Sequence, residues 1–103
     1  MKPGLLLAEE SRWCKFALAK DCDGTHCGIF APGSVKWCLS AAMALYTGLP
    51  VAQQVTRLKA TSVWAQWSEE NRKSEFPIEA TVEGFNDTVN HAVLLEALRE
   101  ANL

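Results

Sequence analysis

Hydrophobic residues follow one another almost without interruption between residues 35 and 46, in the longest such run of the chain. On a helix, at about 100° per residue, the polar side chains near this run share one narrow strip, made of Lys36, Ser40 and Thr47. A helix that is apolar on almost every side belongs in the middle of a bundle rather than on its surface. Ser34 is a suitable N-cap, and Gly48 and Pro50 are typical of a helix end. The pattern predicts a buried central helix over residues 35–47.

Three other segments have the spacing of amphipathic helices, namely residues 5–20, 51–67 and 88–101. Residues 68–75 are strongly charged and predict a loop or a frayed helix end. Residues 76–85 alternate as a strand would, but Pro77 would restrict a strand to a sheet edge, and helical spacing is present too. We expect that segment to be irregular or a short helix. The fold class predicted is all-α, a compact four-helix domain in which three helices pack on the central one.

The composition is that of an ordinary globular protein, with 103 residues, of which 49% are hydrophobic and 21% charged. This length supports one hydrophobic core, so residues 1–103 are expected to form a single domain. The 10 Lys and Arg residues against 12 Asp and Glu residues give a net charge of -2, and no cluster of basic residues interrupts that balance. We therefore expect no binding to nucleic acid.

The first residues, M-K-P-G-L-L-L-A, begin as an export signal does. Glu9, Glu10 and Arg12 end this apolar stretch well short of the roughly 7–15 residues that an export segment needs. No run approaches the roughly 18 apolar residues of a membrane span. We expect a cytoplasmic protein without membrane association, in which the four cysteines are reduced thiols, and no cofactor is predicted.

Short motifs are spread over most of the chain. They are W-C-x-x-A-L-A-x-D over residues 13–21, V-x-W-C over residues 35–38, and F-N-D over residues 85–87 ahead of a final helix. This order resembles a domain-of-unknown-function family of small bacterial and phage proteins. The resemblance implies a compact, mainly helical domain without an established activity, from an accessory or phage-related gene. The chain departs from the family pattern at His26 and Cys27, where ordinary turn residues are expected.

A metal site is one hypothesis, because Cys22, His26 and Cys27 could form a tetrahedral set with one of Cys14, Cys38 or His91. The spacing lacks the C-x2-C or H-x3-H pairs that define structural zinc sites. The D-C-D-G turn at residues 21–24 resembles the start of a calcium loop, but the remaining ligands are missing. We therefore assign no metal.

A second hypothesis is a cysteine nucleophile. Cys14 or Cys38 with His91, and Asn86 or Asp87 as the orienting group, would supply the residue types of a thiol triad. Activated cysteines favour helix N-termini and partly open sites, whereas Cys38 lies within the apolar central segment. We interpret both cysteines as small core residues and keep the thiol enzyme as an alternative.

The F-N-D motif has two interpretations. Asn86 or Asp87 is suited to cap the final helix. In the functional interpretation, Asn86, Asp87 and His91 face a groove beside Trp37 and bind a polar ligand or a partner. These four residues are the predicted ligand- or partner-binding residues.

The sequence favours a non-enzymatic protein-binding or adaptor domain, or a self-associating module. Four tryptophans are many for one small core, and some of them could cover an interface between copies. The alternative is a cysteine-dependent hydrolase or transferase that uses Cys38 or Cys14 with His91.

Overall fold

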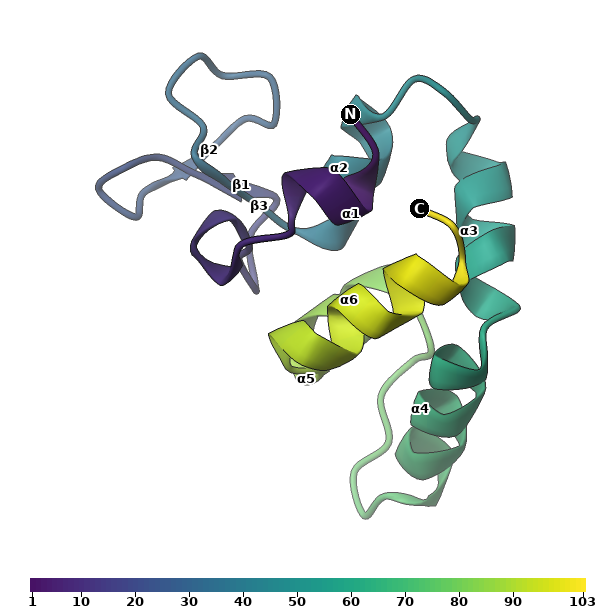
Figure 1. Ribbon diagram of the computed structural model, residues 1–103. Coiled ribbons are helices and arrows are strands. Elements are labelled where there is room, and N and C mark those ends of the chain that lie inside the picture. The colour runs from purple at the N-terminus through teal and green to yellow at the C-terminus, as the bar shows by residue number, and fades with distance from the viewer.

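The computed structural model describes residues 1–103 and contains six α-helices, one 3₁₀ turn and a three-stranded antiparallel sheet (Figure 1). The helices are α1 (Pro3–Leu6), α2 (Leu39–Leu45), α3 (Val51–Lys59), α4 (Ser62–Lys73), α5 (Val82–Thr88) and α6 (His91–Glu100). The 3₁₀ turn η1 and the strands are η1 (Glu10–Arg12), β1 (Ala19–Lys20), β2 (His26–Cys27) and β3 (Lys36–Trp37). The prediction of an all-α four-helix domain is therefore wrong.

The predicted central helix over residues 35–47 is shorter than expected, because its first part is strand β3. Trp37 is paired on both sides: Ala19 lies opposite it in β1, and its carbonyl oxygen accepts the N–H of Cys14 at 3.1 Å. Helix α2 begins only at Leu39, where the Cys38 sulfur accepts the Ala41 N–H at 3.4 Å and replaces the predicted Ser34 cap. A buried strand and a buried helix have the same unbroken hydrophobicity, so the pattern could not distinguish them.

The predicted helix over residues 5–20 is also wrong. Only α1 and η1 are helical there, and the chain then runs extended into β1. Phe16 has φ 61°, which a right-handed helix excludes. Pairing with β3 and complete burial of Ala19 outweigh the modest helical preference of this segment.

The other two predicted helices are each interrupted. Residues 51–67 divide at Thr61, whose hydroxyl accepts the Trp64 N–H at 3.1 Å and starts α4. Helix α4 then continues to Lys73, through residues predicted as a loop or a frayed end. Residues 88–101 divide at Asn90, whose side chain accepts the Val93 N–H at 2.9 Å and caps α6. The segment before α5 is irregular and α5 is short, as expected for that region.

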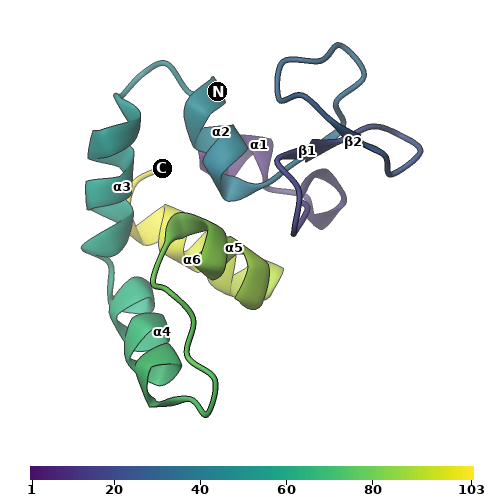
Figure 2. The same ribbon diagram turned by 180° about the vertical axis from the view of Figure 1, so that it is seen from behind.

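Helix α6 lies at the centre of the molecule (Figure 1). Helices α1 and α2 lie on one side of it and α4 on another, and α3 joins these two layers at the end away from the sheet. The view from behind shows α5 alongside α6 (Figure 2). The large hydrophobic side chains of this core that are completely or almost completely buried are Leu7, Leu39, Met43, Leu58, Phe85, Leu94 and Leu98. None of the six helices combines the length and the apolar character needed to cross a membrane.

Candidate functional site

Asn86, in α5, joins the segment around the sheet to the helical core. Only 1% of the residue is exposed, and its side chain makes three hydrogen bonds to distant parts of the chain. Its Oδ1 accepts the indole N–H of Trp13 at 2.6 Å and the backbone N–H of Leu39 at 2.9 Å, and its Nδ2 donates to the Cys14 carbonyl at 3.0 Å. One side chain therefore fixes the segment after η1 against the start of α2.

Asp87 extends this network to the surface. Its Oδ1 accepts the Asn86 Nδ2–H at 3.0 Å and the backbone N–H of Phe16 at 2.9 Å. Phe16 has φ 61°, an unfavourable conformation for a bulky residue, and its side chain is 75% exposed. The network thus holds an aromatic side chain in solvent on a strained backbone.

A surface hollow of about 270 Å³ lies beside this aromatic side chain, and we call it the Phe16 groove. It is lined by Phe16, Ala17, Leu18, Cys38, Glu83, Asn86 and Asp87. Leu18 is 56% exposed, so the groove offers two accessible hydrophobic side chains. Glu83 accepts the Ser40 hydroxyl at 3.0 Å, and no lysine or arginine forms a salt bridge with either carboxylate of the groove. The groove is therefore apolar and acidic.

The four predicted binding residues do not come together as one site. Asn86 and Asp87 line the groove, but both lie within α5 and neither caps the final helix. Trp37 is half-buried, and its indole N–H is buried without a partner. His91 does not line the groove: its Nε2 lies 2.7 Å from the Leu7 carbonyl oxygen, and its ring is tilted by 37° to that of Trp13, with 5.7 Å between centroids.

The groups of the proposed thiol triad are not joined either. His91 forms its hydrogen bond with a backbone carbonyl, whereas the Cys14 thiol donates to the Ala17 carbonyl at 3.5 Å. Burial, reinforced by the neighbouring Cys38, raises the pKa of the Cys14 thiol to about 11. Burial likewise raises the pKa of Cys38. Both thiols are thus stabilised in the protonated form, which is the unreactive one.

The residues of the metal hypothesis are separated by the sheet. His26 and Cys27 are consecutive in β2, and successive strand side chains point to opposite faces. The carboxylate of Asp21 accepts the N–H groups of Asp23 and Thr25 at 2.9 and 3.0 Å, so it closes the turn at Gly24. No group of three or more His, Cys, Asp or Glu side chains is placed to hold a metal ion.

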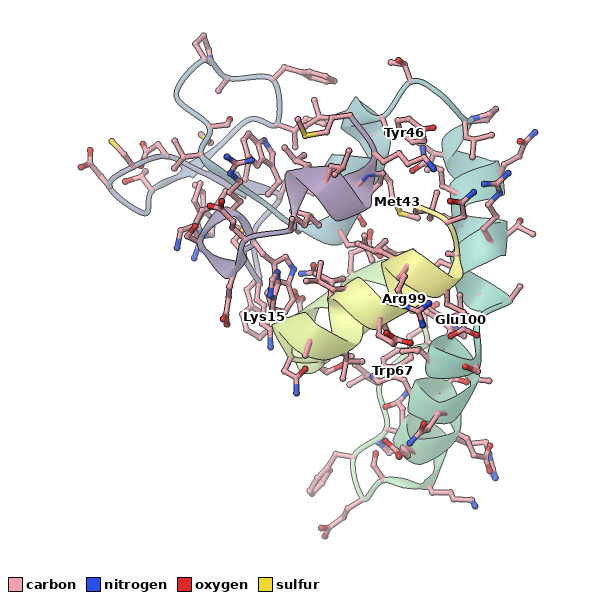
Figure 3. The ribbon with its side chains drawn as sticks, in the orientation of Figure 1. Lys15, Met43, Tyr46, Trp67, Arg99 and Glu100 are labelled. Atoms are coloured by element: carbon pink, nitrogen blue, oxygen red, sulfur yellow. The ribbon has the colours of Figure 1, made fainter.

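A larger hollow, of about 540 Å³, lies between α4 and α6. Among the residues that line it, Trp67 donates its indole N–H to the Thr88 hydroxyl at 2.9 Å, and Glu96 forms a salt bridge with Arg99. Figure 3 shows Trp67 and Arg99 along this side of the molecule. Glu96 thus has a cationic partner within the chain, whereas the two carboxylates of the Phe16 groove form hydrogen bonds but no salt bridge.

Phe16, Leu18 and Glu83 were missed as site residues by the sequence analysis. One signal was present: on the predicted helix, Phe16 falls between Glu9 and Arg12, on the charged face. An aromatic residue on a charged face is a candidate for binding. Comparisons with family models, with curated proteins and with solved structures found no match to the chain.

The different environments of the four thiols predict an order of reaction. All four cysteines are free, with Cys22 exposed, Cys27 half-buried, and Cys14 and Cys38 buried. A thiol reagent at about pH 8 should label Cys22 first and Cys27 more slowly, and leave the other two until the protein unfolds. Mass spectrometry of the digested protein measures this order. Rapid labelling of Cys14 or Cys38 in the folded protein would contradict the burial of these two thiols. It would support the alternative function, a cysteine-dependent enzyme.

Proposed function

We propose that this chain is a non-enzymatic protein-binding module and that the Phe16 groove is its binding surface. The observation that carries the proposal is the exposed Phe16 side chain at positive φ, held by Asp87. Both features are unfavourable for the isolated chain. A left-handed backbone costs a residue with a Cβ about 1–2 kcal/mol, and an exposed phenyl ring gains nothing from burial.

A bound partner would cover the exposed Phe16 ring, and the burial of that ring would then stabilise the complex. Covering a phenyl ring contributes about 1.5–3 kcal/mol, which is enough to offset a backbone strain of about 1–2 kcal/mol. Binding energy at protein interfaces is concentrated in a few anchors, and an aromatic side chain beside a hollow has that character. Leu18 widens the apolar contact, and Glu83 and Asp87 provide a polar rim.

The alternative function, a cysteine-dependent hydrolase or transferase, has less support. It requires Cys14 or Cys38 to give its proton to His91. His91 instead bonds to the Leu7 carbonyl, and both thiols have raised pKa values. The groove contains the Cys38 residue but no base other than carboxylates.

The binding surface is tested by selecting peptides from a random phage-displayed library on the immobilised protein. Selected peptides should bind the wild type and lose at least about tenfold in affinity for Phe16→Gly, which removes the anchor ring. The variant keeps the backbone N–H that bonds to Asp87, and glycine adopts positive φ freely.

Phe76→Ala is the matched control, because Phe76 is another highly exposed phenylalanine but lies outside the groove. It should leave peptide binding unchanged. Failure to enrich any peptide, or equal loss in the two variants, would contradict the proposed binding surface.

A further inference from the structure

The outer face of the sheet continues the Phe16 groove. Side chains alternate along a strand, and Ala19 is completely buried, so Lys20 lies on the opposite, outer face of β1. Leu18 directly precedes β1 and is exposed, and its carbonyl accepts the N–H of Cys38, the residue after β3, at 2.9 Å. The two residues thus connect the groove with the exposed side of β1.

This outer face carries a row of basic side chains. In the register of the sheet, Lys20 lies opposite Lys36 on one side and His26 on the other. Paired residues point to the same face, with Cβ atoms about 5 Å apart. Neither lysine forms a salt bridge. Two like charges directly opposite each other are unfavourable, so the isolated chain gains nothing from this pair.

The surface therefore has three zones in sequence. Glu83 and Asp87 form an acidic end, Phe16 and Leu18 an apolar centre, and the lysine row a basic end. The Cys14 thiol beneath this surface is affected by both ends, since Asp87 raises its pKa while Lys20 and Lys36 lower it.

Lys15, which precedes Phe16 in the sequence, forms no salt bridge with the acidic end. The ammonium of Lys15 lies over the Trp13 ring, 5.1 Å from its centroid, and the side chain is labelled in Figure 3. The opposite charges of the surface thus remain apart within one chain.

From this arrangement we infer that the partner of the groove is a second copy of the chain, docked about a two-fold axis through the apolar centre. The inference rests on the proposed function of the groove. In a two-fold dimer the same patch contacts itself, so a patch with opposite charges at its two ends meets its complement. The acidic end of each copy faces the lysine row of the other, and the two pairs of Phe16 and Leu18 side chains cover each other. The contact between an acidic end and a lysine row therefore occurs twice in the dimer.

Light scattering on the full chain after size-exclusion chromatography, from about 10 µM to 1 mM, tests the inference over the range of transient interfaces. The molar mass should rise with concentration from one chain towards two. Lys36→Glu should raise the dissociation constant by about tenfold or more, because each substitution converts two attractions into repulsions. This variant also places a carboxylate opposite Lys20 in the sheet, so the folded monomer should not melt at a lower temperature.

The decisive variant combines Glu83→Lys with Lys36→Glu. Each substitution alone should weaken the dimer, and the combination should restore binding in part, because positions 83 and 36 attract each other again with exchanged charges while Asp87 and Lys20 keep theirs. The pair Lys59→Glu with Glu75→Lys, at exposed positions outside the groove and the sheet, is the control and should not change the mass.

A wild type with the mass of one chain at about 1 mM would overturn the inference, as would a dimer insensitive to these charges. The peptide selection could still succeed in either case, so failure of the dimer is distinguishable from failure of the binding surface.

Discussion

Replacing Asn86 with alanine is expected to lower the free energy of unfolding by about 3–4 kcal/mol. The substitution leaves the Trp13 indole N–H, the Leu39 N–H and the Cys14 carbonyl without their partner inside the protein. Each unsatisfied buried group costs about 1–3 kcal/mol. Urea unfolding followed by tryptophan fluorescence measures the change.

The control for this variant is Asn90→Ala. Asn90 is exposed and caps α6 through one hydrogen bond to the Val93 N–H, so its loss should cost only about 1 kcal/mol. A loss of only about 1 kcal/mol for both asparagines would contradict the structural role of the buried network around Asn86.

Gln54→Glu is the second variant with a large expected effect, a loss of about 3 kcal/mol or more. Gln54 is completely buried in α3, and its Nε2 donates to the carbonyls of Met43 and Leu49, each at 2.9 Å, and of Tyr46 at 3.3 Å. Met43 and Tyr46 appear in Figure 3 at the end of α2 that faces α3. A carboxylate of the same shape would direct a negative charge at three carbonyl oxygens in a buried site.

The neighbouring Gln53→Glu is the matched control, because it introduces the same charge at an exposed position of the same helix. It should change the free energy of unfolding by no more than about 0.5 kcal/mol. Gln54 holds residues 46–50 against the core, so the structure between α2 and α3 should also lose amide protection in the Gln54 variant. Equal stability of the two variants would refute this role for Gln54.

Hydrophobic spacing located the core better than it located the elements. The run around Ala42 and Met43 is indeed buried in the core, and α3 starts at Val51, immediately after the proline that was expected to end the preceding helix. The turn at Gly24, with φ 78°, follows from its Asp-Gly dipeptide. These features depend on local chemistry, which a sequence displays directly.

The elements that were predicted wrongly depend on contacts between distant residues. Lys36 and Trp37 are a strand only because residues 19 and 20 lie beside them. The break between α3 and α4 depends partly on Glu100, whose carboxylate accepts the Ser62 N–H at 2.7 Å from the last turn of α6 (Figure 3). Neither contact leaves a periodic signal in its own segment.

The candidate site was predicted in part for the same reason. Asn86 and Asp87 were selected from their position in a motif, and the structure places both at the groove. The role of Phe16 follows from a hydrogen bond across 71 positions of sequence, which no spacing rule contains. The one local sign of this role in the sequence is the position of Phe16 on the charged face of the predicted helix.

The free energy of unfolding of Phe16→Gly, measured beside the wild type, tests most directly the claim that Phe16 is held in a strained conformation for binding. Glycine removes the strain of positive φ but adds freedom to the unfolded chain, and the exposed ring contributes little packing. We expect a variant at least as stable as the wild type, with a gain of up to about 1 kcal/mol. A loss of more than about 1 kcal/mol would show that the ring stabilises the chain itself and would contradict the role of Phe16 as a strained anchor for binding.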